Sequence, residues 1–258
     1  METAYLLDNR STHASDRFAA LAAVFDDVTY RHLDAIGVAV GWRCWEVGAG
    51  GPSVPGWLAA RAGGGVLATD LDVRWLDTDQ PYEVRQHDVV TERPPGADFD
   101  LVHVRLLLTH LPARDAVLRT LAGALRPGGW LLVEDFDMAL QPCAVLDARA
   151  PEQHLANRIR AGLTMLLRER GVDPEFGRAL PRRLRDVGLF DVGADAYLPL
   201  AVPATVALEQ ANVEQVRAAL VAIGAATDDE IDAHLAALAA GALDVSTPPL
   251  VSAWGRRP

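Results

Sequence analysis

The fold is decided by the stretch Cys44-Trp45-Glu46-Val47-Gly48-Ala49-Gly50-Gly51-Pro52-Ser53. Its apolar start predicts a buried strand that runs into the glycines at positions 48 and 50, and a helix is expected to begin just after them. Gly48 permits a tight turn, and Gly50 lets the backbone approach a ligand because no Cβ stands in the way. A glycine pair after a strand is not specific by itself, so the neighbouring residues decide which ligand it suits.

Acidic side chains stand where the strands around this turn are predicted to end. Glu46 precedes Gly48 by two residues, and a carboxylate beside a helix N-terminus suits a cationic ligand such as an amino group better than a pyrophosphate. Asp70 lies 20 residues beyond Gly50, at the end of the next predicted strand, where it can accept hydrogen bonds from both hydroxyls of a ribose. Asp88 ends the third predicted strand, where it can accept a hydrogen bond from the amino group of an adenine.

Strands and helices alternate outward from this turn. Short runs rich in apolar, β-branched or aromatic residues are predicted as strands at 43–47, 65–69, 83–87, 100–105 and 130–134. Helical segments such as 57–61 and 113–125 lie between them, and Arg126-Pro127-Gly128-Gly129 is expected to end the last of these helices. Strands joined by crossover helices require a parallel sheet. The pattern therefore predicts an α/β fold with a doubly wound sheet.

The two flanks are more helical than the centre. Further elements are expected as helices within 11–37, around 155–167 and from about 204 to 242, and as strands at 190–200 and 249–255. With these strands the predicted sheet becomes seven-stranded and mostly parallel. On this basis the chain divides into an N-terminal helical lid (1–40), a cofactor-binding core (41–140) and a helical substrate cap that also contains the last strands (141–258).

Composition excludes several classes of chemistry. All 24 basic residues are arginine, so the chain has no lysine to form a Schiff base, to anchor pyridoxal phosphate or to serve a P-loop or kinase site. A net charge of −11 argues against nucleic-acid and anionic-membrane partners, because both repel an acidic surface. The only cysteines, Cys44 and Cys143, form neither a disulfide framework nor a thiolate zinc cluster. Because the N-terminus has no apolar signal region, the protein is expected to be cytoplasmic.

Charge is distributed unevenly in the second half of the chain. Residues 147–185 contain nine arginines and five acids, whereas residues 186–254 contain one arginine and ten acids. One interpretation is that both segments are solvated helix faces. The other is that the basic segment faces an anionic substrate or the acidic segment itself, since arginine offers a fixed charge and a fork of donors.

The motifs resemble those of the class I S-adenosylmethionine-dependent methyltransferases over most of residues 43–136. The resemblance rests on Glu46-Val47-Gly48-Ala49-Gly50, Asp70, Asp88, Phe99-Asp100-Leu101-Val102 and Leu125-Arg126-Pro127-Gly128-Gly129. It implies a Rossmann-like methyltransferase fold and S-adenosyl-L-methionine as the cofactor. It also implies cofactor contacts from Gly48, Ala49 and Gly50 to methionine and ribose, from Asp70 to the ribose, from Leu71 to the adenine, and from Asp88 and Val89 to the adenine edge.

Candidate catalytic residues follow the fourth and fifth predicted strands. Methyl transfer from a sulfonium is an in-line displacement, and a hydroxyl nucleophile benefits from a general base, most often histidine. Thr109-His110-Leu111-Pro112 and Glu134-Asp135-Phe136 are similar to segments of bacterial O-methyltransferases that act on natural products and sugars. This similarity implies that His110 is the base and that Asp135 orients it or holds the substrate. The alternative is that His110 only packs against or caps the following helix.

Two further side chains are assigned to the cofactor. Arg105, at the end of the fourth strand, can bind a carboxylate of the cofactor's methionine or of the substrate. Tyr5 can close over the cofactor as part of the lid. A metal site is not favoured, because the chain reads Asp135-Phe136-Asp137 where a magnesium-dependent enzyme of this kind would have an Asp-Asn pair, but the acids at 134, 135 and 137 leave that alternative open.

The sequence thus predicts an enzyme that transfers a methyl group from S-adenosylmethionine to a small molecule, at a hydroxyl oxygen, in secondary metabolism such as antibiotic biosynthesis. Nitrogen and carbon acceptors remain open, as does a non-methylating enzyme with the same fold and cofactor, for example a cyclase. An NAD-dependent oxidoreductase is disfavoured, because Ser53 replaces the third glycine of the dinucleotide fingerprint and Glu46 precedes the first. A small molecule is the expected partner, and a homodimer stays open.

Overall fold

The computed structural model describes residues 6–7, 14–76 and 79–258. Its strands are β1 (Cys44–Val47), β2 (Val66–Asp70), β3 (Glu83–Gln86), β4 (Phe99–Arg105), β5 (Leu125–Phe136), β6 (Phe190–Tyr197) and β7 (Leu250–Arg256). Its helices are α1 (Ala14–Ile36), α2 (Ser53–Ala62), α3 (Arg114–Ala124), α4 (Pro151–Glu169), α5 (Phe176–Asp186), α6 (Pro203–Ala222) and α7 (Asp228–Ala239), with the 3-10 helices η1 (Val73–Trp75) and η2 (Leu108–His110).

The chain forms two compact units. The sheet unit contains residues 25–136, 176–197 and 250–258, and the helical unit contains residues 1–24, 137–175 and 198–249. The boundary between them falls inside α1, so the second half of this helix belongs to the sheet unit. In the helical unit α4, α6 and α7 pack on one another around a small apolar core. Of the helices in the described ranges, none is long and apolar enough to cross a membrane.

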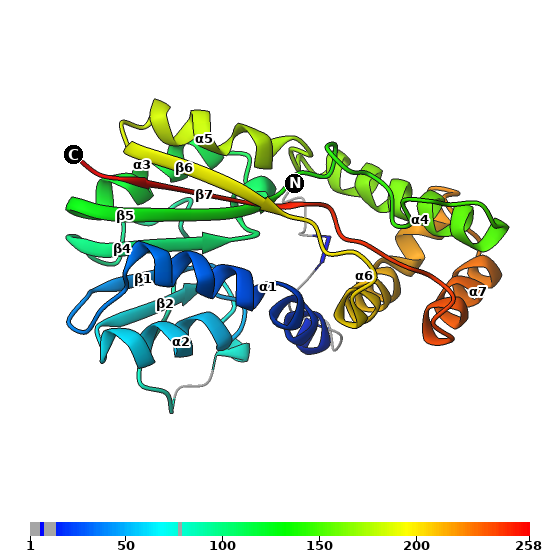
Figure 1. Cartoon of the computed structure of the whole chain (residues 1–258), viewed down its shortest axis with the longest axis horizontal. Helices are drawn as coiled ribbons and strands as arrows, with labels where there is room; N and C mark the ends of the chain where they lie inside the picture. The colour runs from blue at the N-terminus through cyan, green and yellow to red at the C-terminus, as the bar shows by residue number, and fades with distance from the viewer. Residues whose placement is uncertain (1–5, 8–13, 77–78) are drawn as a thin grey trace. The chain divides into compact units, whose positions relative to one another are not determined.

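The sheet unit is built on a seven-stranded sheet in the order β3-β2-β1-β4-β5-β7-β6. Strands β1 to β5 are parallel, and β7 runs antiparallel to both of its neighbours, β5 and β6. In Figure 1 the labelled strands follow one another in this order from β2 to β6. The predicted α/β fold with a mostly parallel, seven-stranded sheet is confirmed. Ligands of such sheets bind outside the carboxyl ends of the strands, where the strand order reverses, which here is between β1 and β4.

Side chains alternate between the two faces of the sheet and form a hydrophobic core on each. Trp45 and Val47 of β1 belong to the core under α3 and α5, whereas Cys44 belongs to the core under α1 and α2. Glu46 should follow Cys44 into this second core, and its carboxylate is indeed buried, with the residue 2% exposed. A buried carboxylate needs partners, since moving an unpaired charge out of water is strongly unfavourable.

Two elements differ from the pattern that the sequence predicts. Strand β5 begins at Leu125, five residues before the predicted start at 130. Residues 125–129 pair with β4 through a register shift and do not form a separate turn before the strand. Gly129 permits this course, since a Cβ there would lie 2.7 Å from the Phe99 carbonyl oxygen. The sequence pattern also does not predict α5, which has Pro181 in its interior.

Candidate functional site

The glycine turn adopts the conformation that its sequence predicts. Gly48 and Gly50 have φ angles of +65° and +62°, in the left-handed region that residues with a Cβ rarely adopt. A Cβ at Gly48 would also lie 2.7 Å from Cδ2 of Leu107, so that side chain would have to move to make room for it. The Ala49 N–H donates to the Thr69 carbonyl oxygen at 3.0 Å, which ties the turn to the end of β2. The turn is therefore fixed at the carboxyl ends of β1 and β2.

Asp70, the last residue of β2, contacts the turn directly. Its Oδ2 accepts a hydrogen bond from the Gly50 N–H at 2.9 Å, and its Oδ1 accepts one from the Asp72 N–H at 3.0 Å. Burial raises the pKa of Asp70, while the backbone donors oppose the rise. A carboxylate has about four acceptor positions, so Asp70 retains capacity for a further donor such as a ribose hydroxyl.

The residues predicted for the adenine follow β2 and β3 at the same edge of the sheet. Leu71 is 62% exposed although it comes directly after a buried strand. Asp88 accepts hydrogen bonds from the Thr91 hydroxyl at 2.7 Å and the Val90 N–H at 2.9 Å, and these bonds, the first above all, lower its pKa. Val89 is partly buried and packs against the core under α3 and α5. An ionised carboxylate and an exposed apolar side chain thus follow β3 and β2 at the carboxyl edge of the sheet.

Asp135 and His110 meet through the backbone of η2. Asp135 is fully buried at the end of β5, and its carboxylate accepts hydrogen bonds from the backbone N–H groups of Thr109 and Phe136, both at 3.0 Å. Burial raises the pKa of Asp135 to about 7. His110 ends η2 directly after Thr109, and its side chain is half-buried. Asp135 therefore fixes the turn that contains His110.

Comparison with known proteins agrees with this geometry. The profile of a family described as a methyltransferase domain matches residues 25–190, which is more than half of the chain. This chain belongs to the class I S-adenosylmethionine-dependent methyltransferases. The enzyme class and the cofactor that the sequence predicts are confirmed by this membership.

Several curated methyltransferases are similar to this one in sequence. Methyltransferase str2 of Strobilurus tenacellus is 34% identical over 181 residues, which cover 61% of this chain and 62% of that protein. Methyltransferase GfsG of Streptomyces halstedii is 29% identical over 125 residues, or 45% of each chain. Phosphoethanolamine N-methyltransferase 1 of Arabidopsis thaliana is 23% identical over 66% of this chain and 33% of its own length. This methyltransferase therefore matches less than two thirds of the length of these relatives.

Solved structures share the fold. Phosphoethanolamine N-methyltransferase 2 of Haemonchus contortus superposes with a TM-score of 0.60 at 14% identity, over 100% of this chain and 62% of that one. A SAM-dependent methyltransferase from Archaeoglobus fulgidus superposes with a TM-score of 0.54 at 13% identity, over 93% and 99% of the two chains. At these identities the likeness concerns the fold alone.

Glu46, predicted to bind the cofactor's amino group, directs its carboxylate to a histidine inside the sheet unit of this methyltransferase. Nδ1 of His103 lies 2.6 Å from Oε2 of Glu46, and Nε2 of His103 lies 3.3 Å from Oε2 of Glu134. Burial alone would lower the pKa of His103, but the two carboxylates, Glu46 above all, raise it to about 9. His103 lies inside β4 and is fully buried between these two acids.

Glu134 on β5 is the centre of this polar group. Besides His103, it accepts hydrogen bonds from the Ser252 hydroxyl at 2.7 Å and the Thr29 hydroxyl at 2.5 Å. Nδ1 of His32 lies 3.2 Å from Oε1 of Glu134, the oxygen that also accepts from Ser252. Burial alone would raise the pKa of Glu134, but the two histidines keep it well below its usual range. We call Glu46, His103, Glu134, Thr29, His32 and Ser252 the sheet cluster.

Arg105 also faces α1. Its guanidinium donates to the Asp26 carboxylate at 2.8 Å and to the Thr29 hydroxyl at 2.9 Å. The Tyr30 hydroxyl lies 3.1 Å from the same carboxylate and 3.2 Å from the carbonyl oxygen of Ser53, the residue that begins α2 after the glycine turn. That Arg105 binds a carboxylate of the cofactor or substrate stays a prediction.

Sequence reasoning missed the polar residues of α1 that take part in these contacts. Asp26, Thr29 and His32 recur at a spacing of three in a segment expected to be helical, so all three fall near one helix face. This spacing indicates that the three side chains share a face. Their partner Glu134 could not be predicted from it, because Glu134 lies 102 residues from His32 and 105 residues from Thr29 in the sequence.

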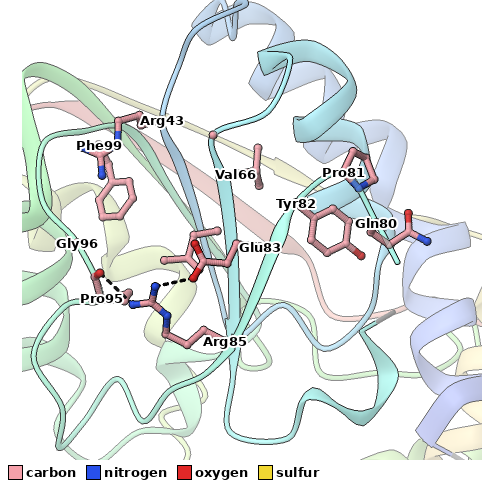
Figure 2. Close-up of a pocket in the computed structure, with 12 residues that line it drawn as sticks. Arg43, Val66, Gln80, Pro81, Tyr82, Glu83, Arg85, Pro95, Gly96 and Phe99 are labelled. Carbon is pink, nitrogen blue, oxygen red and sulfur yellow. Dashed lines mark hydrogen bonds and ion pairs between the residues drawn. The ribbon is translucent and has the colours of Figure 1, made fainter. Parts of the chain in front are cut away.

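A hollow of about 400 Å³ lies at the opposite edge of the sheet. Its lining includes Arg43, Gly65, Glu83 and Phe99, which lie at or just before the starts of β1, β2, β3 and β4. Figure 2 shows the Arg85 guanidinium there, bonded to the Glu83 carboxylate and the Pro95 carbonyl oxygen. This hollow is therefore separate from the glycine turn, which lies at the carboxyl ends.

Two predictions concern the flanks. Tyr5 lies outside the described residues, so its contact with the cofactor stays a prediction. In the arginine-rich segment, Arg158 pairs with Glu230 at 2.5 Å and Arg160 pairs with Glu209 at 2.5 Å. Both acids belong to the acidic segment 186–254, so part of the basic segment faces that segment within the helical unit.

Proposed function

We propose that this methyltransferase transfers the methyl group of S-adenosyl-L-methionine to a hydroxyl oxygen of a small molecule, with His110 as the general base. The observation that supports it best is the pair of buried carboxylates that hold backbone at the carboxyl edge of the sheet. Asp70 accepts from Gly50 of the glycine turn, and Asp135 accepts from Thr109 beside His110. A cofactor cradle and a candidate base are thereby fixed by the same sheet.

The residues at this edge suit the cofactor. Gly48 and Gly50 present backbone without a Cβ, which allows the methionine and ribose part to approach closely. Asp70 has acceptor capacity for the ribose hydroxyls, and Leu71 is an exposed apolar side chain suited to the face of the adenine. Asp88, which is ionised, and the adjacent Val89 would meet the adenine edge. When bound, S-adenosylmethionine supplies a methyl group on a positively charged sulfur.

The work left to the chain is to hold the acceptor and to remove its proton. His110 would accept the hydroxyl proton on a ring nitrogen as the oxygen attacks, which requires the neutral imidazole. Asp135 would act as a positioning residue, because it is fully buried and holds the η2 backbone through the Thr109 N–H. An acceptor from secondary metabolism follows from the similarity of residues 109–112 and 134–136 to segments of natural-product O-methyltransferases. The N-methyltransferase among the relatives keeps a nitrogen acceptor as the second candidate.

The test combines cofactor binding with turnover. We expect calorimetry to detect S-adenosylmethionine and S-adenosylhomocysteine but not NAD, and His110→Ala to leave both affinities nearly intact. With labelled methyl donor and a panel of phenols, sugars and amines, His110→Ala should slow transfer to hydroxyls by about 10²–10⁴-fold. His154→Ala, an exposed histidine on α4, is the matched control and should leave the rate unchanged.

Three outcomes would contradict this proposal at different points. If neither sulfur compound binds, the cofactor assignment fails. If His110→Ala methylates hydroxyls at the native rate, His110 is not the base. If only amines are methylated, the acceptor atom is nitrogen.

A further inference from the structure

A row of polar side chains crosses the sheet unit on the face that α1 covers. Its members are Glu46 on β1, His103 on β4, Glu134 on β5, Ser252 on β7 and Asp195 on β6. Glu46 and His103 occupy paired positions, as do Glu134 and Ser252, and Ser252 and Asp195. The row begins two residues before Gly48 and ends at Asp195, whose side chain is 46% exposed. It therefore connects the start of the glycine turn with the edge of the sheet.

The hydrogen-bond chemistry of this row fixes the protonation of its histidines. Both ring nitrogens of His103 face carboxylates, Glu46 on one side and Glu134 on the other. An ionised carboxylate offers only acceptors, so each nitrogen must bring a proton, and a ring with two N–H groups is an imidazolium. His32 also lies between two carboxylates, with Nδ1 at 3.2 Å from Glu134 and Nε2 at 3.0 Å from Asp195, although the Arg31 guanidinium also approaches Nε2 at 3.5 Å.

We infer that His103 is a positioning residue for the cofactor, whose ring, held between Glu46 and Glu134, fixes the Glu46 carboxylate at the start of the glycine turn. The inference rests on the proposed function, because it takes the cofactor's amino group as the ligand of Glu46. His103 contacts one oxygen of Glu46, and a carboxylate has acceptor capacity for further donors. The cofactor's amino group could therefore donate a hydrogen bond to the Glu46 carboxylate while His103 holds that carboxylate in place.

The burial of Glu46 requires a partner such as His103. The residue is 2% exposed, and a buried carboxylate without a hydrogen-bonding or charged partner is strongly unfavourable. The charged groups that face His103 are Glu46 from β1 and Glu134 from β5. Behind Glu134 lie His32 from α1 and Arg105, which is linked to it through Thr29. The raised pKa of His103, about 9, agrees with an imidazolium at neutral pH.

The test is calorimetry on the full chain with three ligands that share an adenosine. S-adenosylmethionine and S-adenosylhomocysteine have the amino acid part, whereas 5′-methylthioadenosine lacks it. We expect His103→Gln to weaken the first two by about 10–100-fold, the range for a lost charged hydrogen bond, and to leave 5′-methylthioadenosine unchanged. His234→Gln, a buried histidine beside a carboxylate in the helical unit, is the matched control and should change none of the three affinities.

The three ligands separate the possible results. Equal weakening of all three by His103→Gln would mean that the turn has collapsed, and unchanged affinities would mean that His103 has no role in binding; either result overturns the inference. If the native protein binds neither of the first two ligands, it is the proposed function that fails. The double variant Glu46→Gln with His103→Gln should bind no more weakly than Glu46→Gln alone, because the two residues act as one unit.

If His103→Gln does not fold, a measurement on protein that keeps His103, Glu46 and Glu134 takes its place. The chain has seven histidines, and nitrogen-15 labelling of their rings distinguishes an imidazolium from a neutral ring. In the variant His32→Gln at pH 8, where an ordinary histidine is neutral, we expect one ring to remain doubly protonated and to shift when S-adenosylhomocysteine is added. If every ring is neutral, or the charged ring does not respond, the inference is wrong.

Discussion

Each unit of the protein buries a group of charged side chains, and the two groups differ in how far their hydrogen bonds are satisfied. In the sheet cluster, Glu134 receives donors from four side chains, and His103 has a carboxylate at both ring nitrogens. The helical unit contains Arg160, Glu209 and His234, which we call the helical cluster. Arg160 donates to Glu209 at 2.5 Å and to the Ser246 carbonyl oxygen at 3.1 Å.

The helical cluster contains buried polar atoms whose hydrogen bonds are not satisfied. Within the described part of the chain, Nη1 of Arg160, Oε1 of Glu209 and both ring nitrogens of His234 are buried without a hydrogen-bond partner. His234 lies 3.8 Å from Glu209, which is too far for a hydrogen bond. Accordingly the pKa of His234 is lowered, chiefly by burial, while that of His103 is raised. Both histidines are buried, so the difference in their charge comes from the acceptors around them, which outweigh burial at His103 and not at His234.

The largest expected effect comes from removing the centre of the sheet cluster. Glu134→Ala leaves the imidazolium rings of His103 and His32 facing one carboxylate fewer, and removing one partner of a buried ion pair costs about 3–5 kcal/mol of unfolding free energy. Glu209→Ala should cost less, because Arg160 keeps the Ser246 carbonyl oxygen. Urea unfolding followed by fluorescence reports the sheet unit, which contains all six tryptophans, and far-UV circular dichroism reports both units. Equal losses in the two variants would show that satisfaction of the clusters does not matter.

The second effect has the opposite sign in the helical cluster. Replacing a poorly satisfied ionic group by apolar side chains of similar size is often stabilising by about 1–4 kcal/mol. The combined variant Arg160→Met, Glu209→Met and His234→Phe should therefore raise the unfolding midpoint measured by circular dichroism. The matched variant in the sheet cluster, Glu46→Met with His103→Phe and Glu134→Met, should give no gain, since it removes hydrogen bonds that were all made. Stabilisation of both, or of neither, would contradict the comparison.

The sequence predicts features that depend on local contacts and misses those that depend on contacts between distant segments. The glycine turn with Asp70 and Asp88 could be predicted, because strand ends and the backbone demands of Gly48 and Gly50 are written in a short stretch. The interpretation of Glu46 as a free ligand for an amino group missed His103, which pairs with it from the neighbouring strand. That pairing depends on sheet register and on α1 covering this face, and neither follows from the periodicity of a single segment.

The smallest effect is a difference in pH dependence, and it tests the comparison most directly. The folded pKa of His103 is raised, so the folded protein holds a proton that the unfolded chain has released; its contribution is full below about pH 6.5 and is lost as the pH rises to about 9. The folded pKa of His234 is lowered, so the unfolded chain takes up a proton that the folded state does not, and stability falls as the pH drops below about 6.5. One proton changes stability by at most about 1.4 kcal/mol per pH unit.

His103→Gln should therefore flatten the alkaline side of a plot of unfolding free energy against pH, and His234→Gln should flatten the acid side. If the two variants flatten the same side, the histidines do not differ in charge and the number of nearby acceptors is not what sets it.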